Sequence, residues 1–317
     1  METEHIHRLD NLEDQLHGCV LTMGNFDGVH EGHRRILQTC RQYADPHGAP
    51  VVAMTFDPPP DLVLRPGDDP QRIDPLQVKA KLLLEAGADE VVIVTTEPML
   101  LAMAPLEFID QLIMEYFAPR HIVEGRNFFF GLQRSGNVET LRAAGAQRGY
   151  LVHVVDPVGR EIRGESQRVS STLVRLLVQT GRVEEAGEIL TRPFALYGRV
   201  IEGDGQGRKM NYPTANIDPS GQVMPMDGVY AGQAEIEGET CLAAISIGTK
   251  PTFGAHERTV EAYLLDTSGD YYGKGMTLRF FRWLREQEAF QTADILKEHI
   301  AEDVQRVREI CDQFSRP

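Results

Sequence analysis

Two histidines flank a glycine in the stretch GNFDGVHEGH, residues 24–33. His30 and His33 stand three residues apart, so they share a face if a helix begins here. The first turn of such a helix also offers free N–H groups and the positive end of the helix dipole. Gly32 would let a ligand come close to the backbone. The stretch therefore predicts a polyphosphate site with two imidazole donors. A surface histidine pair or a partial metal site is the alternative.

Two further stretches carry hydroxyl groups and glycines. VSSTLVR, residues 169–175, places Ser and Thr where a helix starts, and helix capping alone would explain them. GDGQGRKMNYPTAN, residues 203–216, lacks the GxGxxG spacing of a dinucleotide site, and Pro213 falls where the following helix would run. We expect a glycine-rich loop that leads into an irregular PTAN segment. An ordinary glycine-rich hairpin is the alternative.

Alternating strands and helices must position the first histidine site. Near-continuous apolar runs lie at residues 20–23, 51–56, 91–94, 121–125 and 150–155. Between them lie segments whose apolar residues have the spacing of a helix. This alternation is typical of a parallel sheet covered on both faces, so we predict a doubly wound, Rossmann-like α/β domain. Ligands of such a domain bind beyond the carboxyl ends of the strands.

The pattern changes near residue 191. Short β segments broken by Gly, Pro and Asp begin at 196, 228, 240, 260 and 276, and a helix from about 292 to 314 closes the chain. Short strands at this spacing suggest a small antiparallel β-barrel. We predict two domains, residues 1–186 and 187–317.

Composition restricts the class of protein. The chain has 317 residues, 42% hydrophobic and 25% charged, which is a globular composition. The four cysteines are scattered and indicate neither a zinc site nor a disulfide framework. A formal net charge of −15 disfavours a nucleic-acid partner. The acidic N-terminus is unlike a signal peptide and no apolar run is long enough to span a bilayer, so we expect a soluble cytoplasmic protein without a membrane partner.

These motifs, in this order, resemble the motifs of a known enzyme family. GNFDGVHEGH, TFDPPP (residues 55–60), GRNFFFG (125–131) and VSSTLVR resemble the adenylyltransferase motifs of prokaryotic bifunctional riboflavin kinase/FAD synthetases. PTAN, DGVYAG (227–232), SIGTKPTFG (246–254) and RTVEAYLLD (258–266) are similar to the kinase motifs of that family. The resemblance covers nearly the whole chain. It implies that one domain converts riboflavin and ATP to FMN and ADP, and the other converts FMN and ATP to FAD and pyrophosphate.

The resemblance also implies roles for residues of the first domain. His30 and His33 would stabilise the charge that develops during adenylyl transfer, which needs positioning more than a base because the FMN phosphate is already an anion. The residues expected to bind ATP and FMN are Gly24, Phe26, Asp27, Gly32, Asn127, Ser170, Ser171, Thr172 and Arg175.

In the second domain, the resemblance implies that Glu261 is the base that accepts the proton of the ribityl hydroxyl of riboflavin. Thr214 would hold Mg²⁺ and Asn216 would support it, since a hydroxyl is a suitable hard-oxygen ligand. The further binding residues expected in this domain are Gly203, Gly207, Arg208, Pro213 and Arg285. For Arg285 an ordinary salt bridge is the alternative.

Two positions depart from the family pattern. Pro59 stands where the family usually has the histidine of DPHP, which implies a changed contact on the flavin or phosphate side. Asn211–Tyr212 replaces Gly–Phe, and Asn tolerates the left-handed backbone that such a turn uses. Two other functions therefore stay open: a riboflavin kinase with a degenerate or repurposed first domain, and a flavin-binding or sensing protein without catalysis. A pantetheine- or nicotinate-type adenylyltransferase is disfavoured, because it leaves the barrel motifs unexplained.

Overall fold

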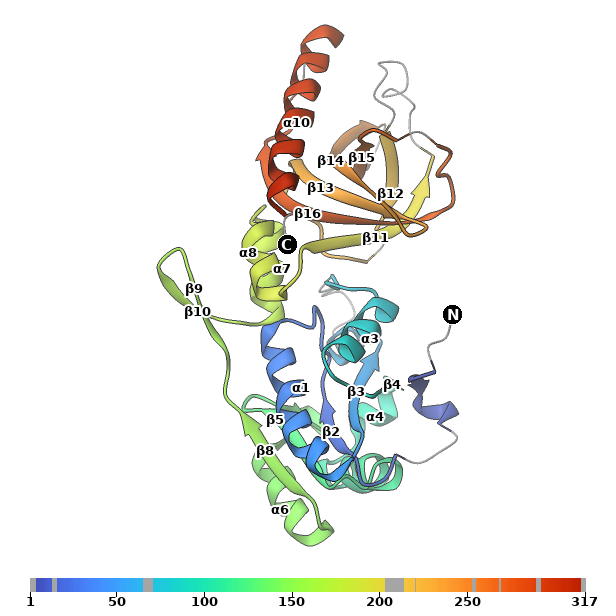
Figure 1. Ribbon diagram of the computed structural model, residues 1–317. Coiled ribbons are helices and arrows are strands. Elements are labelled where there is room, and N and C mark those ends of the chain that lie inside the picture. Colours follow the sequence, from blue (N-terminus) through green and yellow to red (C-terminus); the bar gives the residue numbers. More distant parts are fainter. Residues whose placement is uncertain are drawn as a thin grey trace. The chain divides into compact units, whose positions relative to one another are not determined.

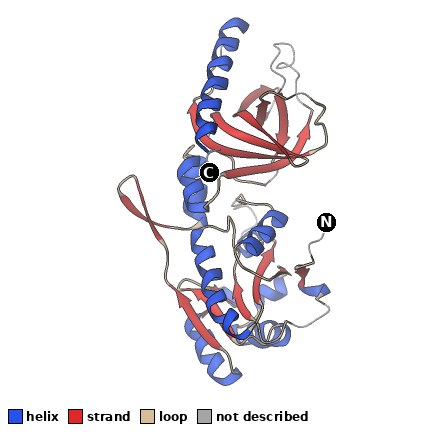
Figure 2. Cartoon of the chain, in the orientation of Figure 1, coloured by secondary structure: helices blue, strands red, loops and turns tan. Residues whose placement is uncertain are grey.

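The computed structural model describes residues 4–12, 16–64, 71–202, 214–219, 221–252, 255–267, 269–288 and 292–314. These residues form two compact units (Figures 1 and 2). The first unit comprises residues 1–70 and 76–170, and the second comprises residues 71–75 and 171–317. The boundary that we predicted between residues 186 and 187 falls inside helix α8 (Val183–Leu190) of the second unit. In the described chain no helix combines the length and apolar character needed to cross a bilayer.

A six-stranded parallel sheet forms the centre of the first unit, in the order β1-β4-β3-β2-β5-β8. Its strands are β1 (Ile6–Arg8), β2 (Val20–Met23), β3 (Val51–Asp57), β4 (Glu90–Thr95), β5 (His121–Gly125) and β8 (Leu151–Val155). The doubly wound α/β prediction is confirmed. The edge strand β1 was missed, because three residues at a polar terminus carry too little apolar pattern to be recognised.

Helices cover both faces of this sheet (Figure 2). The larger ones are α1 (Glu31–Ala44), α3 (Leu76–Glu85), α5 (Pro105–Phe108), which continues into a π-helical segment (Ile109–Met114), and α6 (Val138–Arg148). Two short helices are α2 (Pro60–Leu64) and α4 (Pro98–Ala102). Successive residues of β2 pack into the two hydrophobic cores on opposite faces of the sheet. Val20 packs with α1 and α3, whereas Leu21 packs with the segment after α5 and with α6.

Two small hairpins complete the first unit. One pairs β6 (Phe129–Phe130) with β7 (Gly136–Asn137), and Asn137 then caps α6 by accepting the amides of Glu139 and Thr140. The other pairs β9 (Gly159–Ile162) with β10 (Glu165–Arg168). Our sequence analysis missed both hairpins, since their strands are short and β9 and β10 are largely polar.

The second unit is a closed barrel of six antiparallel strands, in the order β11-β12-β15-β14-β13-β16 (Figure 1). The strands are β11 (Phe194–Ile201), β12 (Thr214–Asp218), β13 (Gly228–Ile236), β14 (Glu239–Thr252), β15 (Ala255–Leu264) and β16 (Gly275–Arg285). Helices α7 (Ser171–Gln179) and α8 precede the barrel, and α10 (Ala293–Phe314) follows it. The barrel and the final helix are confirmed. Thr214–Asn216 of the PTAN segment are not irregular as expected, because they begin strand β12.

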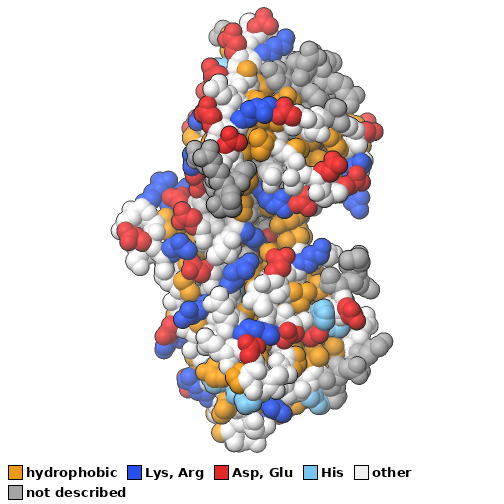
Figure 3. Space-filling model, viewed as in Figure 1, with side chains coloured by type: hydrophobic (Ala, Val, Ile, Leu, Met, Phe, Trp, Pro, Cys, Tyr) orange, Lys and Arg blue, Asp and Glu red, His pale blue; other side chains and the backbone are white. Residues whose placement is uncertain are grey.

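Apolar side chains fill the barrel and attach the final helix to its outer face. Tyr230 and Phe280 are buried and meet edge to face, with ring centroids 5.3 Å apart. On the outside, Val307 and Ile310 of α10 pack with Phe281 and neighbouring residues of the barrel. Basic and acidic side chains alternate over the visible surface in Figure 3, so neither sign of charge dominates that face.

Candidate functional sites

The histidine pair lies at the start of α1, as the sequence predicts. His30 is the N-cap residue and His33 lies in the first turn. Their rings stack with centroids 3.7 Å apart and an interplanar angle of 16°. Phe26 meets His33 edge to face at 5.2 Å. The prediction that both imidazoles share one face is therefore confirmed.

Both imidazoles are held neutral by burial. Burial, opposed by a backbone hydrogen bond and helped by the nearby Arg168, lowers the pKa of His30 to about 4. Burial lowers the pKa of His33 well below its ordinary value, helped by His30 and Lys79. Among the residues that the structure describes, neither Nδ1 atom has a hydrogen-bond partner. Two buried ring nitrogens without partners at a helix N-terminus fit the oxygens of a bound phosphate.

Gly32 makes room for a neighbouring side chain, and its role in the approach of a ligand stays a prediction. A Cβ atom at this position would lie 3.1 Å from Cε1 and 3.2 Å from Nδ1 of His30. The missing side chain therefore leaves room for the imidazole itself, and it lets the two rings stack beneath the helix start. Gly24 acts similarly, because its Cβ would lie 3.3 Å from the ring of Phe26.

Two cations near this site were not predicted. Lys79 of α3 is buried and donates to the backbone carbonyl of Asn25, 3.0 Å away. Arg168 ends β10 and donates 2.6 Å to the side-chain oxygen of Asn127, with the amide oriented so that its oxygen faces the guanidinium. Arg168 stands two residues before Ser170, and this closeness to a predicted site residue was the available signal. A lysine on a helix gives no such signal, since most are exposed.

The serine–threonine run is divided by the boundary between the units. Ser170 ends the first unit, whereas Ser171, Thr172 and Arg175 begin the second on α7. Arg175 donates through Nε to the carbonyl of Gln71, 2.8 Å away in the same unit. The helix start at VSST is confirmed. The phosphate-binding role of these residues stays a prediction.

The TFDPPP motif ends strand β3. The peptide bond between Asp57 and Pro58 is cis, and helix α2 begins at Pro60. The carbonyl of Pro59 accepts the amide of Leu62 at 3.0 Å. Pro59 therefore lies at a strand-to-helix corner, where it contributes its backbone to the first turn of α2.

In the barrel, the predicted kinase residues lie on adjacent strands. Glu261 of β15 pairs directly with Asn216 of β12, and the Thr214 hydroxyl donates to Glu261 Oε2 at 3.4 Å. Their neighbours Ala215 and Val260 are buried in the barrel, so these three half-buried side chains share its outer face. The structure thus brings Thr214, Asn216 and Glu261 together.

This outer face has the oxygen donors that Mg²⁺ prefers. A hydroxyl and a carboxylate stand within hydrogen-bond distance of each other, and the described residues hold no cluster of three His, Cys, Asp or Glu side chains suited to a metal. Mg²⁺ typically takes one or two protein ligands and completes its shell with water and substrate phosphates. The donor set therefore fits Mg²⁺ and does not fit a softer metal.

The remaining kinase predictions divide into two groups. Gly203, Gly207, Arg208 and Pro213, together with the departure at Asn211–Tyr212, lie outside the described residues. Arg285 is described, and it forms a bidentate ion pair with Asp303 of α10, at 2.8 Å between Nη2 and Oδ2. Asp303 is buried, so the salt bridge is not the exposed one that the sequence left as the alternative, and a flavin contact of Arg285 stays a prediction.

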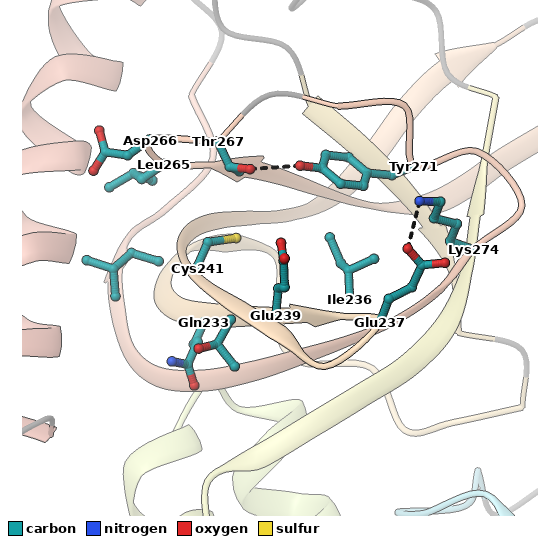
Figure 4. Close-up of a pocket in the computed structure, with 12 residues that line it drawn as sticks. Gln233, Ile236, Glu237, Glu239, Cys241, Leu265, Asp266, Thr267, Tyr271 and Lys274 are labelled. Atoms are coloured by element: carbon teal, nitrogen blue, oxygen red, sulfur yellow. Dashed lines mark hydrogen bonds and ion pairs between the residues drawn. The ribbon is translucent and has the colours of Figure 1, made fainter.

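A cavity of about 700 Å³ opens near one end of the barrel (Figure 4). The hairpin between β13 and β14 and the connection from β15 to β16 supply its lining. Glu237 binds Lys274 at 2.8 Å, and the Thr267 and Tyr271 hydroxyls lie 2.8 Å apart. Glu239 and Asp266 add two more carboxylates. Two of these three carboxylates are paired with cations, Glu237 with Lys274 and Asp266 with Arg308 of α10.

Comparison with known proteins identifies both units. A family model described as FAD synthetase matches residues 12–173, and one described as riboflavin kinase matches residues 190–311. Bifunctional riboflavin kinase/FMN adenylyltransferases from Pseudomonas fluorescens and Escherichia coli strain K12 are 34% and 35% identical to this chain. Each alignment covers 96% of both proteins.

A solved structure extends the likeness to the fold. It is described as a macrolide-efflux protein from Streptococcus pneumoniae, and it is 28% identical with a TM-score of 0.87. The match covers 96% of this chain and 99% of that one. The family models and the curated relatives agree with each other and with the motifs. This chain belongs to the family of bifunctional riboflavin kinase/FMN adenylyltransferases.

Proposed function

We propose that this chain makes FMN from riboflavin and ATP in its second unit, and FAD from FMN and ATP in its first. Family membership supports both activities. The observation that carries the adenylyl-transfer assignment is the stacked His30–His33 pair, with buried ring nitrogens at the start of α1. ATP, riboflavin and FMN are the small-molecule substrates.

In adenylyl transfer, an oxygen of the FMN phosphate forms a bond to the α-phosphorus of ATP. The bond from that phosphorus to the bridging oxygen breaks, and pyrophosphate leaves. The nucleophile is already ionised, so the protein must orient it and stabilise charge. His30 and His33 donate hydrogen bonds to the phosphate oxygens, and Arg168 adds a positive charge beside them. Ser170, Ser171, Thr172 and Arg175 bind the departing β- and γ-phosphates.

In the kinase reaction, Glu261 accepts the proton of the ribityl hydroxyl as its oxygen attacks the γ-phosphorus, and ADP leaves. The strand pairing with β12 and β14 supports this role, because a carboxylate on a barrel strand is rigidly held. Thr214 would hold Mg²⁺ with Asn216 in support, and the bound ion would neutralise charge on the phosphates.

The purified protein with riboflavin, ATP and Mg²⁺ tests this function, with FMN and FAD separated by chromatography. We expect FMN first and FAD later. FMN without FAD, even when FMN is supplied, would support the rival in which the first unit is degenerate, and Pro59 would be its first suspect. No product of either kind would support a flavin-binding protein without catalysis.

A further inference from the structure

We propose that Glu124, at the carboxyl end of β5, is a positioning residue for adenylyl transfer. Its side chain substitutes for a missing backbone partner at the end of β2 and so fixes the turn that leads to His30 and His33. The family pattern, the sequence motifs and the mechanism above give this residue no role. The inference rests on the proposed FAD-forming activity of the first unit.

Strands β2 and β5 pair over only part of their length. The pairing described between them covers Val20 with His121 and Leu21 with Ile122. Beyond these pairs β2 stays with β3 through Met23, and β5 stays with β8 through Gly125. These two neighbouring strands therefore separate at their carboxyl ends. Such a gap, where the chain changes direction across the sheet, is where doubly wound folds bind their ligands.

Glu124 bridges this gap with a hydrogen bond. The amide of Met23 donates to Glu124 Oε1 at 2.7 Å. The next amide, that of Gly24, points the other way and donates to the carbonyl of Met54 on β3 at 3.0 Å. The end of β2 is thus held on one side by the backbone of β3 and on the other by a single side chain of β5.

The environment of Glu124 indicates that the hydrogen bond, and not the charge, is what matters. The residue is 2% exposed. Burial raises the pKa of its carboxyl well above the usual value, and the Met23 amide opposes this increase. A carboxyl oxygen accepts the amide in either protonation state, and so would the oxygen of a glutamine. An alkyl side chain would leave a buried amide without a partner.

The turn after Met23 needs such support. Phe26 and Val29 both have left-handed backbones, with φ of 49° and 37°, and Gly28 has a φ of 85°. Residues with a Cβ atom occupy this region only where the surroundings determine it. Lys79 donates a hydrogen bond to the carbonyl of Asn25 within the turn, and Glu124 accepts one from the amide of Met23, where the turn begins. Without the hydrogen bond from Met23 to Glu124, the start of the turn could move, and the imidazoles would then be misplaced relative to the α-phosphate.

The test compares Glu124→Leu, which removes the acceptor at similar size, with Glu124→Gln, which keeps it. We expect Glu124→Leu to lower kcat for FAD formation from supplied FMN at least tenfold, with KM for FMN changed less than threefold. Glu124→Gln should stay within threefold of the unaltered protein. FMN formation by the second unit shows in the same samples whether the protein is intact.

Ile122→Val is the matched control, because it perturbs the same buried strand and leaves the acceptor in place. It should keep kcat within threefold. Hydrogen exchange supplies a readout that needs no turnover: peptides covering residues 20–30 should exchange faster in Glu124→Leu and unchanged in Glu124→Gln. Three outcomes would overturn the proposal: unchanged kcat and exchange in Glu124→Leu, an equal loss in Glu124→Gln, or an equal loss in Ile122→Val. Failure of the proposed function is distinct, because the unaltered protein would then make no FAD.

Discussion

The two candidate sites differ in how their reactive groups are held. In the first unit, His30 is only 5% exposed and stacks on His33 beneath a helix start. In the barrel, Glu261 and Thr214 stand half-buried on the outer face of two paired strands. The buried site keeps two neutral imidazole donors in fixed positions. The barrel site presents a carboxylate and a hydroxyl that are partly exposed.

This difference matches what each reaction requires. Adenylyl transfer begins with an ionised phosphate, so the protein must mainly place donors where charge develops. Phosphorylation of a hydroxyl also requires a proton acceptor within hydrogen-bond reach of the substrate. Burial suits the first task and partial exposure the second. Substitutions that separate the two reactions are therefore the strongest tests of the comparison.

The largest effect is expected for Glu261→Ala. Loss of the proton acceptor should lower FMN formation by about 10²–10⁴-fold, while FAD formation from supplied FMN should persist. The matched control is Glu235→Ala, which removes another half-buried glutamate from a barrel strand. Both rates are measured by chromatography of the flavins. Loss of both reactions in Glu261→Ala with intact fold would contradict the assignment.

The converse separation is expected for His30→Ala. Removing one buried donor should lower FAD formation by about 10²–10³-fold and leave FMN formation unchanged. His47→Ala, which removes an exposed histidine of the same unit, should leave both rates unchanged. An unaffected FAD rate in His30→Ala would mean that the histidine pair is not part of the site.

Arg285→Ala should affect stability before activity. It leaves the Asp303 carboxylate buried without its guanidinium, so the free energy of unfolding should fall by about 3–5 kcal/mol. Arg282→Ala, which breaks an exposed ion pair with Glu184, should cost less than about 1 kcal/mol. Denaturant unfolding followed by the fluorescence of Trp283 measures both. A kinase defect in Arg285→Ala without loss of stability would instead place Arg285 in the flavin site.

The smallest effect concerns pH. The pKa of His30 is about 4 in the folded chain and near 6.5 when unfolded, so between these values the unfolded state binds more protons. The stability of the first unit should be complete above pH 6.5 and decrease as pH falls towards 4, by about 3 kcal/mol from His30. His30→Asn should remove that part of the decrease, as hydrogen exchange of first-unit peptides can show. An unchanged pH dependence in His30→Asn would contradict the burial argument.

Local pattern was enough to predict much of this molecule. The βα alternation and the β-barrel follow from periodicity, and the histidine pair follows from three-residue spacing at a helix start. Strand β12 was missed because a glycine-rich segment precedes it. Its residue Asn216 pairs with Glu261, which lies 45 residues further along the sequence. Sequence alone cannot show that Arg285 meets Asp303, that Arg168 reaches Asn127, or that Glu124 completes β2. These contacts depend on how elements pack, and no local signal encodes them.

If two independent sites act in succession, two variants that each lack one site should complement each other when they are mixed. Glu261→Ala alone should leave riboflavin unchanged, and His30→Ala alone should stop at FMN. A mixture of the two proteins with riboflavin, ATP and Mg²⁺ should make FAD, because FMN released by one is adenylylated by the other. A mixture that accumulates FMN without FAD, although Glu261→Ala was chosen to keep the first site intact, would contradict the account.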